Sequence, residues 1–313
     1  YLLLLQKKEE ASINFAVIKP SVKVIDYAKT DLKSKSPTVT NIGIVSILLG
    51  FGIPTALVFI LLSNNTKIQT PNDLNNFLSS DIPVVGEIPF LNDKELKQNI
   101  QSNLSRSTLA ESIRMVLSNL SFISSIDGQK NESDNDCKTY LVTSSIKGEG
   151  KTIFSVNAAN LLAGGDKKVI LIGADLRNPQ IHKFLKIERT RLGLTDYLYK
   201  NDFKWEDFLI KNDNLDILLS GTIPPNPTEM ISSLKLEELL NDLKLKYDYI
   251  VIDSAPSLLV SDTFSLAKFA DLTVYLIRSD FTEYNLMRYI NENHNLGKLP
   301  NISVVLNALG VKN

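Results

Sequence analysis

Cysteine, histidine and tryptophan are nearly missing from this sequence. Its 313 residues include one cysteine, Cys137, two histidines and one tryptophan. A single cysteine excludes a disulfide bond within the chain. His182 and His294 have no cysteine or histidine neighbour at metal-ligand spacing, so we interpret both as ordinary surface or helix residues. The sequence also has no large excess of positive or negative charge. The 34 basic residues face 35 acidic residues, a balance that predicts no nucleic-acid partner.

Charge is absent altogether from one long apolar run. Residues 41–62 read NIGIVSILLGFGIPTALVFILL, and about 20 apolar residues suffice to cross a bilayer. The glycines and proline within the run would weaken a soluble helix but are common in membrane helices. A buried core helix is the alternative, yet such a helix rarely runs this long without a polar face. We therefore predict a transmembrane helix over residues 41–63, with the lipid bilayer as a partner.

Beyond about residue 107 the sequence predicts an α/β domain. A helix with apolar residues on one face covers 109–123, and apolar strand-like runs follow it. These runs are TYLVTSS, KKVILIG, LDILLS, YDYIVID, LTVYLIR and ISVVLNA. Strands that are apolar throughout are buried on both faces, which indicates a parallel sheet flanked by helices. Ligands of such sheets bind beyond the carboxyl ends of the strands.

One loop at such a strand end is a variant of the phosphate-binding loop G-x-x-x-x-G-K-[ST]. Residues 144–152 read SSIKGEGKT, and Ser145 stands where the first glycine belongs. Ser145 can replace that glycine if its φ is negative. Gly148 and Gly150 allow the backbone to approach phosphates closely. Lys151 is expected to reach the β- and γ-phosphates of ATP, and the Thr152 hydroxyl to bind Mg²⁺. The alternative is a Gly-Lys turn that caps a helix.

Two acidic positions follow other strands. Asp253 ends the run YDYIVID, where a second carboxylate is expected to hold Mg²⁺ through water. Asp175 and Arg177 follow the run KKVILIG. The predicted nucleotide contacts are Ser145, Gly148, Glu149, Gly150, Lys151, Thr152 and Arg177. The predicted metal ligands are Thr152, Asp175 and Asp253, and the predicted catalytic residues are Lys151, Asp175 and Asp253.

The orientation of the chain in the membrane follows from the phosphate loop. Residues 1–40 contain seven lysines and four acidic residues, which by the positive-inside rule would make them cytoplasmic. ATP is a cytosolic ligand, however, so we place residues 64 onward in the cytoplasm. The chain lacks an initiator methionine and is expected to be a fragment, in which case an upstream helix can set the topology. Residues 64–106 contain turn signals and are predicted to be a linker.

Together these motifs resemble those of the bacterial protein-tyrosine kinases of capsule and exopolysaccharide export. LLLLQKKEEASINFA resembles the end of the periplasmic segment of chain-length determinant proteins, within residues 1–40, and IPVVGEIPF, SGTIPPNPTEMISS and GLTDYL resemble other family signatures. The resemblance implies a homo-oligomer in the bacterial inner membrane, whose cytoplasmic domain, residues 107–313, uses ATP and Mg²⁺ to phosphorylate tyrosines on neighbouring copies. It further implies an export and polymerisation machinery and a cognate phosphatase as partners.

Four features depart from the pattern of that family, and the first is Lys147, where the family usually has proline. Gly173 replaces the first acid of its D-x-D-x-R motif. Asp175 is therefore expected both to bind magnesium and to act as the general base. Restoring an aspartate at 173 is then expected to speed transfer. The assembly motif E-x-x-R-x-x-R keeps Glu111 and Arg114 but has Leu117, which predicts weaker assembly. The chain stops at LNALGVKN, so we expect the tyrosine-rich tail to be missing from it.

Two other functions remain open. Partitioning and septum-positioning ATPases share the predicted fold, but they carry a signature lysine five residues before the lysine of the loop, where this chain has Ile146. A copolymerase subunit whose ATP site controls assembly alone is the other alternative, and Gly173 favours it.

Overall fold

The computed structural model describes residues 1–17, 26–27, 37–63, 66–91, 107–126, 137–200 and 202–309. The chain divides into two units, Tyr1–Asn65 and Thr66–Asn313. Most of residues 18–38, the later part of the expected linker, 92–106, and the last residues, 310–313, lie outside the described residues.

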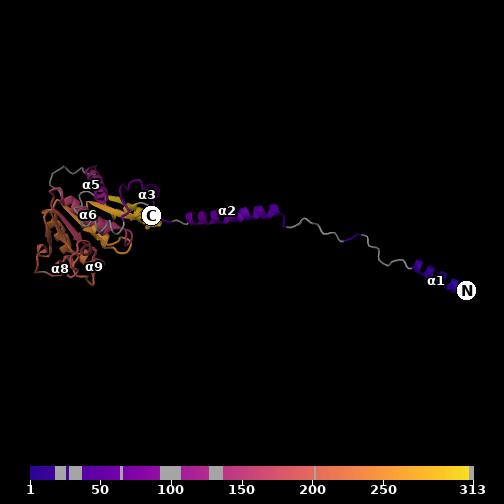
Figure 1. Ribbon diagram of the computed structural model, residues 1–313. Helices are drawn as coiled ribbons and strands as arrows, with labels where there is room; N and C mark the ends of the chain where they lie inside the picture. Colours follow the sequence, from indigo (N-terminus) through magenta and orange to yellow (C-terminus); the bar gives the residue numbers. More distant parts are fainter. Residues whose placement is uncertain are drawn as a thin grey trace. The chain divides into compact units, whose positions relative to one another are not determined.

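The described residues of the first unit form the helices α1 (Leu2–Val17) and α2 (Val39–Ser63), drawn in indigo and violet in Figure 1. The helix α2 lies at the predicted span and includes Pro54. Its stretch Val39–Ile60 is long and apolar enough to cross a membrane, and none of that stretch is buried inside the protein. Apolar side chains that no protein surface covers are those expected of a helix that contacts lipid.

The second unit is built on one sheet of eight strands in the order β1-β8-β7-β2-β6-β3-β5-β4. All neighbouring strands run parallel except β4, which is antiparallel to β5. The strands are β1 (Val84–Pro89), β2 (Lys138–Ser144), β3 (Val169–Gly173), β4 (Ile210–Asn212), β5 (Leu215–Leu218), β6 (Tyr249–Asp253), β7 (Leu272–Arg278) and β8 (Ile302–Leu309). The six apolar runs of the sequence form β2, β3, β5, β6, β7 and β8, so the predicted fold class is confirmed.

Helices cover both faces of the sheet, and each face has its own core. Side chains alternate along the central strands, so that Ile250 and Ile252 belong to one core and Val251 to the other. The helices α5 (Thr108–Ile126), α6 (Lys151–Ala163) and α7 (Ile181–Phe184) contribute to the core that contains Val251. The opposite core includes residues of α3 (Pro71–Phe77), α8 (Leu194–Tyr199), η2 (Trp205–Phe208), α9 (Pro227–Ile231), α10 (Leu234–Lys244), α11 (Asp262–Ala267) and α12 (Asn285–Asn295).

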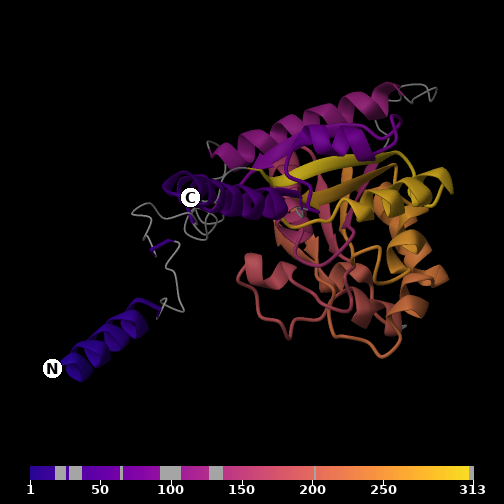
Figure 2. The same ribbon diagram turned by 90° about the vertical axis from the view of Figure 1, so that its right-hand side faces the viewer.

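The apolar face predicted for the helix over 109–123 is buried, as expected. Leu109, Ile113, Val116, Leu117 and Leu120 of α5 are each at most 9% exposed. In Figure 2, α5 (magenta) runs along β1 (purple) beside the yellow strand β8.

Part of the predicted linker belongs to the sheet, which corrects that prediction for residues 84–89. Strand β1 pairs with β8, and Val85 and Ile88 are buried beneath α5. A Cβ on Gly86 would lie 2.6 Å from Val116 Cγ2, so glycine at this position permits the close approach of strand and helix. The proline and glycine that read as turn signals mark the end of an edge strand and a helix contact instead.

Candidate functional site

The predicted site residues meet at the carboxyl edge of three adjacent strands. Strand β6 lies between β2 and β3, and Asp253 pairs in register with Val142 on one side and Gly173 on the other. The backbone N–H groups of Ala174 and Asp175 both donate to the Asp253 carbonyl, at 2.8 and 3.0 Å. The loop that follows β2, the carboxylate that ends β6 and the acid that follows β3 are therefore brought together.

The two glycines of the loop adopt a conformation that other residues rarely take. Gly148 and Gly150 have φ of +95° and +100°. A Cβ on Gly150 would lie 2.1 Å from Asn307 Nδ2, which donates to the Glu149 carbonyl at 2.8 Å. Arg278 donates to the Gly148 carbonyl at 3.0 Å. Side chains from the ends of β7 and β8 thus hold the loop backbone in place.

Buried hydroxyl groups hold Ser145 in place. Its φ is negative, as its replacement of glycine requires, and its side chain is fully buried. The hydroxyls of Ser145 and Ser257 each lie 2.9 Å from the Tyr275 hydroxyl, and Ser257 Oγ donates to the Ser144 carbonyl at 3.1 Å. This buried chain of hydroxyls joins the variant phosphate-binding loop, residues 144–152 and called the phosphate-type loop below, to the segment after Asp253.

Lys151 begins α6 and is 7% exposed. Burial lowers the pKa of its ammonium, whereas Asp253, Glu149 and Asp175 raise it. Among the residues that the structure describes, only Ser144 Oγ accepts a hydrogen bond from its Nζ, at 2.8 Å. An ammonium group has three donors, so two of them remain for a ligand.

Asp253 is the buried carboxylate of the site, with 2% of its surface exposed. The hydroxyls of Thr152 and Ser155 donate to it, the latter at 3.2 Å. Burial raises the pKa of Asp253 to about 7, and Lys151 opposes the shift. A buried carboxylate and a neighbouring hydroxyl offer the hard oxygen ligands that Mg²⁺ prefers, and oxygens of substrate and water usually complete its shell.

A metal centre made of side chains alone is not found. Within the described ranges, no group of three or more His, Cys, Asp or Glu residues lies close enough to hold a metal ion. Mg²⁺ usually takes one or two carboxylates and obtains its other ligands from substrate and water. Thr152, Asp253 and Asp175 match this coordination preference, because they supply two carboxylates and one hydroxyl.

Asp175 and Arg177 are placed differently from one another. Asp175 Oδ1 accepts from the backbone N–H groups of Asn178 and Arg177, at 2.9 and 3.3 Å, and no described residue donates to its Oδ2. The Arg177 guanidinium instead donates to Asp262 Oδ2 at 3.0 Å and to Thr228 Oγ1 at 2.8 Å. Arg177 therefore joins α9 to α11, and its expected contact with the nucleotide stays a prediction.

The carboxylate of Glu149 forms its hydrogen bonds within the protein. It is fully buried and accepts from the Ile146 N–H at 2.8 Å and from the Thr282 hydroxyl. Burial raises the pKa of Glu149, and these hydrogen bonds lower it. A contact between Glu149 and a nucleotide would have to come from its backbone.

Gly173 is more constrained than the motif indicates. A Cβ at this position would lie 2.7 Å from Ser220 Oγ, 3.0 Å from Ser220 N and 3.2 Å from Ile181 Cδ1. A side chain at 173 therefore requires Ser220 to shift, and the expectation that an aspartate there speeds transfer stays a prediction. The crowding comes from Ser220, which follows the neighbouring strand β5, and from Ile181.

The assembly motif lies on α5. Glu111 and Arg114 form an ion pair on the outer side of the helix, whereas Leu117 is buried in the core. An arginine at 117 would bury a charge beneath α5, so the departure from the family pattern has a packing reason.

Sequence reasoning missed several residues that shape the site. Arg278 and Asn307 lie at or near the ends of strands, where the rule for parallel sheets would have found them. Thr282, Tyr275 and Asp262 carry no local signal, because each contacts a residue more than 80 positions away.

Comparison with known proteins places this geometry in context. Residues 138–297 match the family model described as an AAA domain. The chain is 35% identical over 198 residues to the tyrosine-protein kinase YwqD of Bacillus subtilis, covering 60% of this chain and 80% of YwqD. It is 27% identical over 299 residues to the AmsA protein of Erwinia amylovora, covering 89% of this chain and 39% of that relative.

A solved structure agrees in both sequence and fold. The VpsO kinase domain is 33% identical, superposes with a TM-score of 0.54 and covers 62% of this chain and 94% of its own length. The chain belongs to the family of bacterial tyrosine-protein kinases.

Proposed function

We propose that this chain is a membrane-anchored, ATP-dependent protein-tyrosine kinase that phosphorylates neighbouring copies of itself. The observation that carries the proposal is the meeting of Lys151 and Asp253 at the ends of β2 and β6, with Asp175 beside them. The names of the relatives support the reaction type, and the apolar helix α2 supports the anchor.

Each residue has a distinct part in the proposed reaction. The N–H groups of the loop and the ammonium of Lys151 bind and orient the phosphates of ATP, and Thr152, Asp253 and Asp175 hold Mg²⁺. The metal neutralises charge on the transferred phosphoryl group when it is bound. Asp175 Oδ2 accepts the proton of the tyrosine hydroxyl. General base help adds about 10²–10⁴-fold, so a single acid in two roles gives a slow enzyme rather than an inert one.

We extend the proposal to location and partners. The domain from residue 64 onward faces the cytoplasm at the bacterial inner membrane, and assembly proceeds through the Glu111 and Arg114 surface of α5. The polysaccharide polymerisation and export machinery and a phosphatase complete the set of partners. Replacement of Arg114 by Ala should reduce both oligomer size and phosphorylation in trans, and no change in either would leave α5 with an ordinary surface ion pair worth at most about 0.5 kcal/mol.

The competing function is ATP binding that controls assembly without phosphoryl transfer. The crowding of Gly173 by Ser220 favours it, because a second acid at that position would require Ser220 to shift. Incubation of the protein with labelled ATP and a tyrosine peptide separates the functions. Phosphotyrosine supports the kinase, release of free phosphate alone supports a partitioning-type ATPase, and bound ATP without turnover supports the assembly subunit.

A further inference from the structure

A hollow lined by basic residues lies on the same edge of the sheet as the proposed nucleotide site. It is a small hollow, open to solvent, and is lined by Pro179, Ile181, His182, Arg189, Arg191, Leu219, Ser220 and Gly221. These residues come from the segments that follow β3 and β5. None of them is acidic.

Two polar side chains of the hollow lack partners in the described part of the chain. Ser220 is 5% exposed, and no residue in the described part of the chain forms a hydrogen bond with its hydroxyl. No described carboxylate lies within ion-pair distance of the Arg189 guanidinium. The carboxylate of Asp196, which lies behind Gly221, is already engaged by the N–H groups of Gly193 and Thr222.

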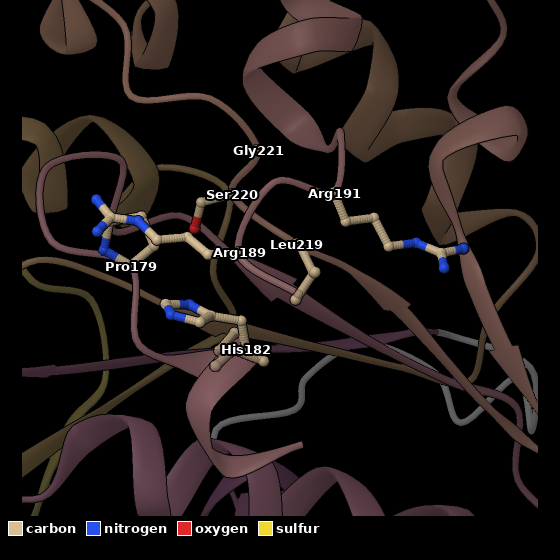
Figure 3. Close-up of a pocket in the computed structure, with 8 residues that line it drawn as sticks. Pro179, His182, Arg189, Arg191, Leu219, Ser220 and Gly221 are labelled. Carbon is tan, nitrogen blue, oxygen red and sulfur yellow. The ribbon is translucent and has the colours of Figure 1, made fainter. Parts of the chain in front are cut away.

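Figure 3 shows how the side chains are arranged. Arg189, His182 and Ser220 lie around the same space, with Pro179 at its rim, whereas the guanidinium of Arg191 points away from it. Arg191 instead donates to the Leu209 carbonyl at 3.5 Å. A guanidinium, an imidazole and a hydroxyl that converge without a carboxylate form a site for an oxyanion.

The hollow is close to the proposed reaction centre. Ser220 follows β5, and its hydroxyl is 2.7 Å from the position of a Cβ on Gly173, which pairs with Asp253 across β3 and β6. Two strand spacings separate β5 from β6, which is about 10 Å. A peptide spans that distance with about three extended residues.

The anion that fits both the chemistry and the place is the product of the proposed reaction. We propose that this hollow binds a phosphotyrosine on the acceptor chain while another tyrosine of that chain occupies the transfer site. The inference rests on the proposed kinase function. It gives the enzyme a way to retain an acceptor that carries several tyrosines.

The test measures binding without ATP, on the whole chain in lipid nanodiscs. Fluorescence anisotropy compares a short peptide of alternating tyrosine and glycine that carries one phosphotyrosine with the same peptide unphosphorylated, and with glutamate at the modified position. We expect the phosphopeptide to bind about tenfold more tightly than either, since it gains a charge-assisted contact. Arg189→Ala should reduce this preference to about twofold or less.

Two controls locate the effect. Arg191→Ala removes a neighbouring guanidinium that points away from the hollow and should keep the preference. Lys151→Met should keep it too, because that variant disables the phosphate-type loop and not the hollow. Equal binding of all three peptides to the wild type, equal losses in Arg189→Ala and Arg191→Ala, or loss in Lys151→Met would each overturn the inference.

The same samples separate this inference from the kinase proposal. Phosphoryl transfer to the unphosphorylated peptide with no binding preference would leave a kinase without the subsite. A preference that depends on Arg189, with no transfer, would leave a phosphotyrosine-binding site on a chain that is not a kinase.

Discussion

The hydroxyl of Thr282 donates to the buried carboxylate of Glu149, and so joins the phosphate-type loop to the segment that follows β7. The same segment is held from its other side, because the Ile68 N–H donates to the Thr282 carbonyl at 2.9 Å. Ser279 Oγ likewise donates to the Gln69 carbonyl at 3.0 Å. Residues 66–69, which follow α2 closely in sequence, are therefore connected to the phosphate-type loop through Thr282 and Glu149.

Loss of the Thr282 hydroxyl should destabilise the protein through Glu149. Thr282→Val keeps the shape of the side chain but leaves a buried carboxylate without one of its donors, which costs about 1–3 kcal/mol. Thermal unfolding should show a clearly lower Tm for Thr282→Val and a nearly normal Tm for Thr282→Ser, which keeps the hydroxyl. Identical unfolding of the Val and Ser variants would mean that the hydrogen bond contributes nothing.

The stability of the ligand-free protein should fall as the pH rises from about 4 to about 7. The pKa of Asp253 is about 7 in the folded protein, because burial disfavours its charge, and about 3.9 in an unfolded chain. Between these values the folded state holds the extra proton, so deprotonation favours unfolding. Asp253→Asn should flatten this part of the Tm profile, and an unchanged profile in that variant would contradict the assignment.

Gly173 should tolerate a side chain only when Ser220 gives way. Gly173→Ala places a methyl group 2.7 Å from Ser220 Oγ, and such overpacking costs about 1–3 kcal/mol. Calorimetry should therefore find a lower Tm for Gly173→Ala. Combination with Ser220→Gly should recover part of the loss, since the hydroxyl is then absent.

A Gly173→Ala variant as stable as the wild type would argue against the crowding. An acid at 173 would then be accommodated, and its absence would need another reason.

The membrane topology is testable with introduced cysteines. After Cys137 is replaced by Ser, a cysteine at position 35 should react with an impermeant reagent on intact cells. A cysteine at the exposed position 67 should react only after lysis. Labelling of position 67 on intact cells would instead support the orientation that the positive-inside rule gives.

Local patterns in the sequence were enough for the central strands and the loop, and not for the contacts that fix them. The runs around Ile170 and Ile250 are apolar because both faces of the sheet are covered, so composition reveals them. Strand β1 was not predicted, because its six residues are bounded by prolines that are typical of turns and pair with β8, more than 200 positions away.

The spacing of residues in the sequence also does not predict the direction in which a side chain points. Position along β3 predicted that Arg177 follows the strand, and it does. Its guanidinium nevertheless turns to Asp262, a residue that only tertiary structure brings near. The burial of Glu149 against Thr282 has the same origin, since 133 positions separate the two residues.

Phosphotyrosine formation on a supplied tyrosine peptide tests the kinase proposal most directly. Labelled ATP, Mg²⁺ and the peptide are incubated with the wild type, Lys151→Met, Asp175→Asn and the control Lys167→Met, whose lysine pairs with Asp248 at the opposite edge of the sheet. We predict transfer by the wild type and the control, near-complete loss in Asp175→Asn, and weaker ATP binding in Lys151→Met by roughly 1.5–3 kcal/mol. Tight binding of ATP by the wild type without any phosphotyrosine would contradict the account and leave an assembly subunit in its place.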